Sequence, residues 1–140
     1  MSQKAADLRV GDSISQVVVE NLTRTQIVQY AGASGDYNPL HTDEVYATQV
    51  AGFPSVFAHG MLTMAMTGKA LTDWLGDGRL VRFGVRFKAQ VWPGATLTTT
   101  LTVEGLRTET DATYVDVAVS TADDAGTEVL SGYATGIVDA

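Results

Sequence analysis

The chain has 140 residues, of which 45% are hydrophobic and 18% charged, and its formal net charge is −7. This length and composition predict one globular domain, residues 1–140, and the negative charge disfavours nonspecific binding to nucleic acid. The absence of cysteine excludes disulfides and thiolate metal sites. Because the sequence lacks both a run of about 18 apolar residues and the apolar core of a signal peptide, we expect a cytoplasmic protein that does not enter a membrane.

The N-terminal part is predicted to contain a strand followed by a helix. The β-branched residues of DSISQVVVEN, residues 12–21, are typical of a strand. In the segment that follows, Thr23 and Gln26 have the spacing of a capping box, which marks the start of a helix. We expect Gly32 and Gly35 to end this helix.

The segment GDYNPLHTD, residues 35–43, combines an acid, an amide, a proline and a histidine. Pro39 fixes its own φ and favours an extended Asn38, so we expect a shaped loop that can bring Asp36 and His41 to one point. A histidine can exchange a proton near neutral pH, and a carboxylate beside it can orient a water. Asn38 can tie the loop down or hold a water. The same residue types also form ordinary turns, so this segment alone leaves both interpretations open.

Two helices are predicted next. Thr42 is expected to cap a short one. The segment 60–75 has apolar residues on several sides at helical spacing, so we predict a helix that is buried on most sides, with its methionines in the core. The N–H of Gly60, at the positive end of this helix dipole, suits a developing oxyanion on a carbonyl. His59, directly before it, is interpreted as a structural residue that hydrogen-bonds neighbouring backbone.

The second half of the chain changes to a period of two. Apolar and polar residues alternate over residues 80–92, which predicts a half-buried strand, and three more strands are predicted around residues 97–103, 115–119 and 128–138. The fold class is therefore α+β, with a curved antiparallel sheet wrapped around the central helix of residues 60–75. The sheet edges and spare apolar surface favour a dimer.

Two segments, YAGASGDYNPLHTDEVYA and AHGMLTMA, resemble the MaoC-like, or R-specific enoyl hydratase, family of hotdog-fold proteins. The shared signature is an acid, then Asn-Pro, then a histidine five residues after the acid, followed later by His-Gly at the start of the central helix. The similarity continues through TDWLGDGRLVRFGVRF to small actinobacterial dehydratase subunits that act on 3-hydroxyacyl thioesters in fatty acid or mycolic acid synthesis. The residues that match the signature are Asp36, Asn38, Pro39, His41, His59 and Gly60.

The resemblance implies a single MaoC-like hotdog domain with hydro-lyase activity. The expected reaction is the reversible hydration of a trans-2-enoyl thioester to the (R)-3-hydroxyacyl thioester. Asp36 and His41 would hold and activate the water, one of them would return a proton to C2, and the Gly60 amide would polarise the thioester carbonyl. No metal or separate cofactor is implied, because coenzyme A or the phosphopantetheine of an acyl carrier protein enters only as part of the substrate.

Weaker expectations concern substrate binding. Tyr37 is a candidate pocket wall, Met61 can line an acyl pocket, and Gly68 can make room for an acyl chain. Arg86 lies on one predicted strand face with two other basic residues, Arg82 and Lys88. This face can meet the phosphates of coenzyme A or an acidic carrier protein, or it can simply be solvated.

Two alternative roles remain open from the sequence. The chain can be one subunit of a heteromeric dehydratase complex, paired with a second hotdog chain in a heterodimer instead of a homodimer. An acyl thioesterase is less favoured, because such an enzyme would place its carboxylate on or beside the central helix. The first acid of that helix is Asp73, at its far end.

Overall fold

The computed structural model describes residues 2–140. Within them, the chain forms five strands, two α-helices and two short helical turns. In chain order these are η1 (Ala5–Asp7), β1 (Ser13–Val19), α1 (Arg24–Ser34), η2 (Tyr46–Val50), α2 (Gly60–Leu75), β2 (Leu80–Phe87), β3 (Leu97–Thr108), β4 (Thr113–Ala122) and β5 (Glu128–Val138). None of the helices in this part of the chain has the length and hydropathy needed to cross a membrane.

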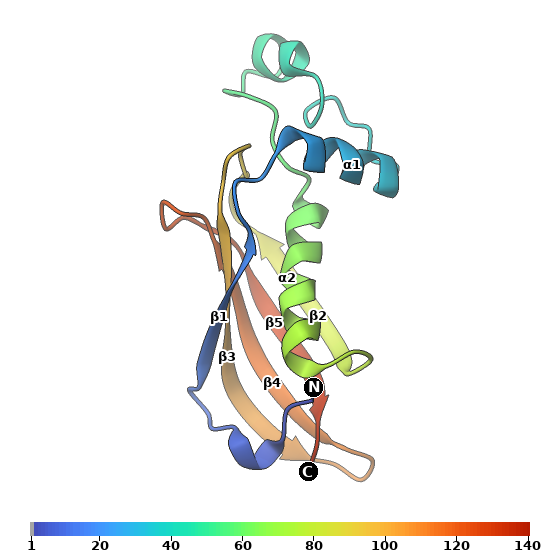
Figure 1. Cartoon of the computed structure of the whole chain (residues 1–140), viewed down its shortest axis with the longest axis vertical. Helices are drawn as coiled ribbons and strands as arrows, with labels where there is room; N and C mark the ends of the chain where they lie inside the picture. Colours follow the sequence, from blue (N-terminus) through green and yellow to red (C-terminus); the bar gives the residue numbers. More distant parts are fainter. Residues whose placement is uncertain (1) are drawn as a thin grey trace.

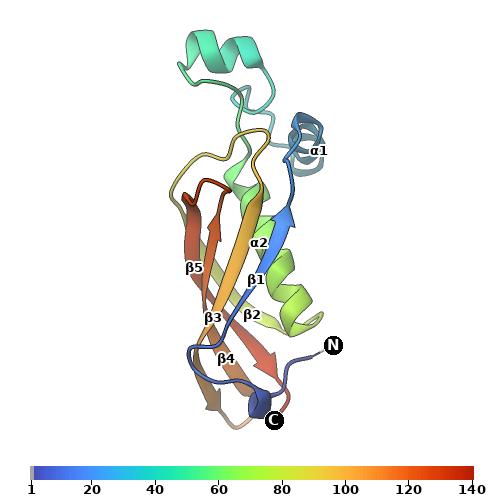
Figure 2. The same cartoon turned by 60° about the vertical axis from the view of Figure 1, so that its left-hand side comes forward.

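The five strands form one antiparallel sheet in the order β1-β3-β4-β5-β2. Figure 1 shows α2 lying along one face of this curved sheet, as the sequence predicted. Near the N-terminus of α2, helix α1 and the segment between α1 and α2 extend beyond the end of the sheet, and Figure 2 shows the same arrangement from another side. The loop with the predicted chemistry therefore lies where α2 begins.

The core lies between α2 and the inward face of the sheet. Alternate residues of β3 and β4 point inward, as their period of two predicted. They pack against Leu71 and Leu75 of α2. A second cluster, at the end where α2 begins, includes Ile27 of α1 and Leu62 of α2. This cluster fixes α1 against the start of α2.

The boundaries of the first helices differ in part from the predictions. The capping box of Thr23 and Gln26 is present as predicted. The prediction that Gly32 ends α1 was wrong, because the helix continues to Ser34 and Gly35 caps it in the left-handed conformation, with φ 75°. The prediction that Thr42 caps the next helical turn was also wrong. The residue that does so is Asp43, whose Oδ1 accepts a hydrogen bond from the Tyr46 N–H at 3.0 Å.

Helix α2 has the predicted bounds but is less buried than expected. The sheet covers only one side of it, so Met61, predicted to be in the core, is 55% exposed. Among residues 2–140, no further layer covers the face of α2 that points away from the sheet. The buried residues of α2 are Leu62, Thr63, Thr67, Ala70, Leu71 and Leu75.

Strand β2 is shorter than the alternating pattern predicted and lies at an edge of the sheet. It ends at Phe87 because the following segment leaves the sheet to pack beside the chain that precedes α2, where the Ala58 N–H donates to the Val91 carbonyl at 2.8 Å. Val81 and Phe87, predicted to be buried, are 55% and 48% exposed. These apolar side chains are exposed because β2 lies at the edge of the sheet, although the alternating pattern predicted that they would be buried.

Candidate active site

The loop after α1 is shaped by its own polar side chains. Oδ1 of Asp36 accepts a hydrogen bond from the Asn38 N–H at 3.2 Å, and Oδ1 of Asn38 accepts one from the Leu40 N–H at 3.0 Å. The carbonyl of Asn38 then accepts from the His41 N–H at 3.0 Å. These successive turns reverse the chain between Asp36 and His41. Of the two roles predicted for Asn38, its side-chain oxygen performs the structural one, tying the loop down.

The imidazole of His41 is oriented by the backbone. Its Nδ1 lies 2.6 Å from the carbonyl oxygen of Phe57, and the rings of the two residues meet edge to face at 5.2 Å. A carbonyl can only accept a hydrogen bond, so Nδ1 carries the proton in this contact. In the neutral ring, Nε2 is then left with a lone pair. His41 is half-buried, so this nitrogen has the form of a general base beside solvent.

His59, the residue before α2, is buried against this pair. Its Nε2 lies 3.0 Å from the backbone oxygen of Asp36, and its ring stacks on the ring of His41 with centroids 3.9 Å apart. Ligand-type side-chain atoms of Asp36, His41 and His59 all lie within 4.8 Å of one another. The fold thus brings together Asp36, His41 and His59, all of which match the signature. The partner of His59 is 23 residues away and not the neighbouring backbone that was predicted.

The same three side chains are poorly arranged to hold a metal ion. An imidazole binds a metal in the plane of its ring, along the nitrogen lone pair. The two rings are stacked with only 25° between their planes, so lone pairs that lie in these nearly parallel planes do not meet at one nearby point. One nitrogen of each ring is also bonded to a backbone carbonyl. This arrangement suits a water and a proton better than a metal ion.

A hollow of about 310 Å³ opens beside the first residue of α2. Gly60 lies on its wall, and the N–H of a first helical residue has no acceptor within the helix. A Cβ built on Gly60 would come within 3.2–3.3 Å of the ring of Phe87, so glycine leaves the amide accessible at a crowded point. The hollow is lined by Phe57, Ala58, Gly60, Thr63, Phe87, Lys88, Ala89, Gln90, Val91 and Val129.

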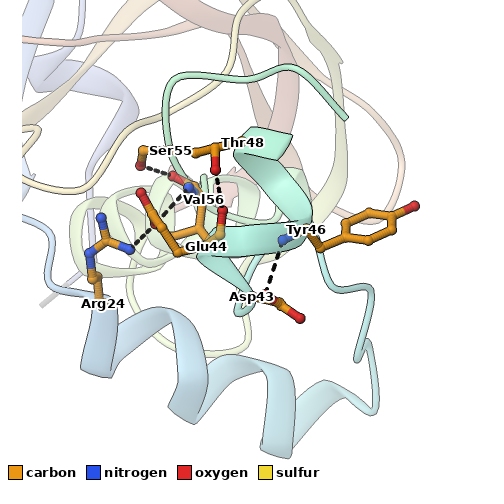
Figure 3. A network of polar contacts seen from close by, with 7 residues as sticks. All are labelled: Arg24, Asp43, Glu44, Tyr46, Thr48, Ser55 and Val56. Atoms are coloured by element: carbon orange, nitrogen blue, oxygen red, sulfur yellow. Dashed lines mark hydrogen bonds and ion pairs between the residues drawn. The ribbon is translucent and has the colours of Figure 1, made fainter. Parts of the chain in front are cut away.

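A polar clamp, made by Arg24, Glu44 and Val56, fixes the segment that carries His41 (Figure 3). The carboxylate of Glu44 pairs with the guanidinium of Arg24 on α1, and its Oε2 also accepts from the buried Val56 N–H at 3.3 Å. The hydrogen bond from Arg24 lowers the pKa of Glu44 from its ordinary value. Val56 directly precedes Phe57, whose carbonyl orients His41. The clamp therefore acts on the backbone that aims the imidazole.

The other residues predicted for substrate binding lie at different places. Tyr37 is 69% exposed in the loop, and Met61 is exposed beside Gly60. Gly68 faces the ring of Phe83, 3.3 Å from where its Cβ would stand, so the predicted room for an acyl chain is taken by that ring. Arg86 is exposed on β2.

Two residues named in the sequence analysis, Lys88 and His59, make contacts near the site that the sequence did not predict. Lys88 does not continue the strand face of Arg82 and Arg86, because β2 has already ended. It lines the hollow beside Gly60 and pairs with Glu128, while Arg82 stacks over the ring of Tyr133 at 4.5 Å. His59 hydrogen-bonds the backbone as predicted, but its partner is the carbonyl of Asp36, 23 residues away, and not the neighbouring chain.

Comparisons with known proteins agree with this fold. The model of the MaoC like domain family matches residues 5–125. The chain is 37% identical over 136 residues to the (R)-specific enoyl-CoA hydratase of Rhodospirillum rubrum, covering 96% of this chain and 90% of that protein. It is 45% identical over 71 residues to 3-hydroxyacyl-thioester dehydratase Y of Mycobacterium tuberculosis, covering 49% of this chain and 24% of that protein.

A solved structure with a similar fold is the unliganded R-hydratase PhaJ1 from Pseudomonas aeruginosa. It superimposes with a TM-score of 0.82 at 27% sequence identity, over 99% of this chain and 86% of that one. The chain spans about a quarter of the length of dehydratase Y and of two other curated relatives. The family match nevertheless covers most of the present chain, and on that basis the protein belongs to the MaoC-like domain family.

Proposed function

We propose that this protein is a hydro-lyase that reversibly hydrates trans-2-enoyl thioesters to (R)-3-hydroxyacyl thioesters. The observation that carries the proposal is the oriented His41, whose imidazole lies within 4.8 Å of the Asp36 carboxylate at the end of α2 where Gly60 presents its N–H. The names of the R. rubrum and M. tuberculosis relatives support the substrate class and the R configuration.

The proposed hydration proceeds through an enolate. Nε2 of His41 accepts a proton from a water held against Asp36, and the water oxygen bonds to C3 of the substrate. The electrons of the C2–C3 double bond move to the thioester oxygen, where the Gly60 N–H stabilises the developing charge. A proton returns to C2 as the carbonyl re-forms, either directly from the His41 imidazolium or through Asp36, whose carboxylate first takes that proton from the imidazolium. One water is added, and the enzyme regains its starting protonation.

We place the thioester in the hollow beside Gly60. Its carbonyl would face the Gly60 N–H, and Lys88 and Gln90, which also line the hollow, would meet the polar pantetheine arm. The exposed Tyr37 and Met61 would contact the substrate at the same end of α2, and the amide nitrogen of Asn38 would help to hold the water. No bound cofactor takes part in this scheme, since coenzyme A or phosphopantetheine belongs to the substrate.

We further propose that two hotdog chains pair, as a homodimer or with a second chain of the same fold. The free edge of β2 exposes apolar Val81 and Phe87, and the uncovered side of α2 exposes Met61. Natural proteins cover such an edge or pair it. Native mass, measured with and without the product of a neighbouring gene, distinguishes the two assemblies.

A thioesterase is disfavoured by the position of the acid on α2. Asp73 lies at the end of the helix far from Gly60, where its carboxylate accepts hydrogen bonds from Lys69 at 2.6 Å and Gln16 at 3.1 Å. These contacts lower the pKa of Asp73 and occupy it in surface pairing.

The test is to mix the protein with a 2-enoyl-CoA and follow the loss of absorbance of the conjugated thioester. His41→Ala and Asp36→Asn should each slow the reaction by about 10²–10⁴-fold, the usual contribution of a general acid or base. Asp43→Asn is the matched control, because asparagine can still cap the turn that follows, so its rate should equal that of the wild type. Full activity in both site variants would contradict the proposed function.

A further inference from the structure

His59 is held in a single orientation by a long-range hydrogen bond. Its side chain is 2% exposed, and its Nε2 lies 3.0 Å from the backbone oxygen of Asp36. Because a carbonyl only accepts, Nε2 must carry the proton, and the neutral ring then has a bare Nδ1. This bond fastens Asp36, in the loop of residues 35–43, to the residue that precedes α2.

The ring of His59 also forms the surface on which His41 rests. The two imidazoles stack at 3.9 Å, and the edge-to-face contact between His59 and Tyr30 of α1 has centroids 4.9 Å apart. Both catalytic groups therefore touch His59, Asp36 through its backbone oxygen and His41 through its ring face. His59 itself is enclosed by these contacts and has no access to a substrate in the hollow.

If residue 59 served only to fill space in the core, a histidine would be less favourable there than an apolar ring. Nδ1 of His59 is buried and has no hydrogen-bond partner among the described residues. A buried acceptor without a partner destabilises a fold, and an aromatic hydrocarbon ring would fill the same space without that penalty. The Nε2–H donor is the feature that such a ring would lack. The structure therefore points to the bond with Asp36 as the reason for a histidine here.

We propose that His59 is a positioning residue that holds the Asp36 loop, through its Nε2–H donor, in the geometry required for water activation. This inference rests on the proposed function, since it concerns the same site. It assigns to His59 no contact with the substrate and no proton transfer. Its effect on the rate should therefore pass through Asp36.

Two substitutions separate the hydrogen bond from the ring. His59→Gln keeps an amide donor at about the position of Nε2 but removes the ring, whereas His59→Phe keeps a ring and removes the donor. We expect His59→Gln to retain kcat within about tenfold and His59→Phe to lose about 10²-fold, the effect of a displacement of about 1 Å at a reacting group. KM should change little in both. A kcat for His59→Phe equal to or above that of His59→Gln would overturn the proposal.

A double variant tests whether the effect passes through Asp36. If it does, Asp36→Asn combined with His59→Phe should be no slower than Asp36→Asn alone. Independent, multiplying losses would contradict the proposal. Leu62→Ala, which removes a buried side chain from the same turn of α2, is the control for lost stability: it should lower Tm and leave kcat unchanged.

A spectroscopic measurement needs no activity. Nitrogen NMR of the wild-type imidazoles should show His59 protonated at Nε2 and His41 at Nδ1, and a proton on Nδ1 of neutral His59 would refute the proposal even if the variants failed to fold. If the wild type failed to hydrate enoyl thioesters, the proposed function would fall. The tautomer of His59 and the displacement of the Asp36 loop signals in His59→Phe would still test the positioning role.

Discussion

Replacing Gly60 with alanine should separate stability from catalysis. The new Cβ would stand 3.2–3.3 Å from three atoms of the Phe87 ring, a few tenths of an ångström closer than an ordinary contact. Phe87 is 48% exposed, so its ring can shift outward at little cost. Alanine also favours a helix over glycine by up to about 1 kcal/mol. The two effects oppose each other, and Tm should stay within a few degrees of the wild type.

The kcat/KM of Gly60→Ala should fall clearly below that of the wild type. The methyl group stands beside the N–H that would receive the thioester oxygen, so the oxygen cannot approach as closely. Removing an oxyanion donor outright costs about 10²–10³-fold, and Gly60→Ala keeps the donor while obstructing it. We therefore expect kcat/KM to fall by about 10–10²-fold, equivalent to about 1.4–2.7 kcal/mol of transition-state stabilisation. The assay is the loss of enoyl-thioester absorbance, run alongside thermal unfolding.

Gly32→Ala is the matched control for helix propensity. Gly32 lies within α1, and a Cβ there would meet nothing within 4 Å. This variant should gain stability of up to about 1 kcal/mol and keep the wild-type rate. If Gly60→Ala retained kcat/KM within twofold of Gly32→Ala, the Gly60 amide could not be the group that receives the thioester oxygen.

Three further predictions concern the space over Gly68, Arg86 on β2, and the clamp made by Arg24, Glu44 and Val56. Phe83→Ala removes the ring that fills the space over Gly68. The ratio of kcat/KM for a long enoyl-CoA to kcat/KM for a short one should therefore rise about tenfold. An unchanged ratio would show that the acyl chain does not reach Gly68. Arg86→Ala should raise KM for the thioester more than it lowers kcat, and an unchanged KM would place Arg86 on a solvated face. The hydrogen bond from Arg24 lowers the pKa of Glu44 from 4.5, so the stability that this pair contributes is present above that pH and is lost as the pH falls through the lowered pKa. Tm of Glu44→Gln should therefore be below that of the wild type at neutral pH, and the gap should close in acid; a gap independent of pH would contradict the pairing.

Local signals in the sequence were sufficient for most of the elements. The capping box of Thr23 and Gln26 starts α1, and α2 runs from Gly60 to Leu75 as predicted. The alternation in β3 and β4 identifies the residues that face the core. These features are set by residues that are close along the chain, so the spacing of apolar and polar residues is enough to predict them.

The errors arise where a residue's environment is set by distant parts of the chain. The alternating pattern of β2 continues past Phe87, but the chain leaves the sheet there because Val91 bonds to Ala58, more than 30 residues earlier. Likewise, the apolar stripe of α2 includes Met61, which the sheet does not cover. Hydrophobic periodicity marks which faces are apolar, and it does not say which of them the same chain will bury.

The chemistry of the site depends on the backbone more than on neighbouring side chains. His41 donates through Nδ1 to the carbonyl of Phe57, and His59 donates through Nε2 to the carbonyl of Asp36, so two main-chain oxygens set both tautomers. Carbonyls do not titrate, and these assignments therefore do not change when a side chain nearby gains or loses a proton. They change when the backbone moves. The clamp at Glu44 contacts neither histidine, but it holds the Val56 N–H next to the Phe57 carbonyl that bonds His41. Under the proposed mechanism, we therefore expect the clamp to help keep Nε2 of His41 free to act as a base.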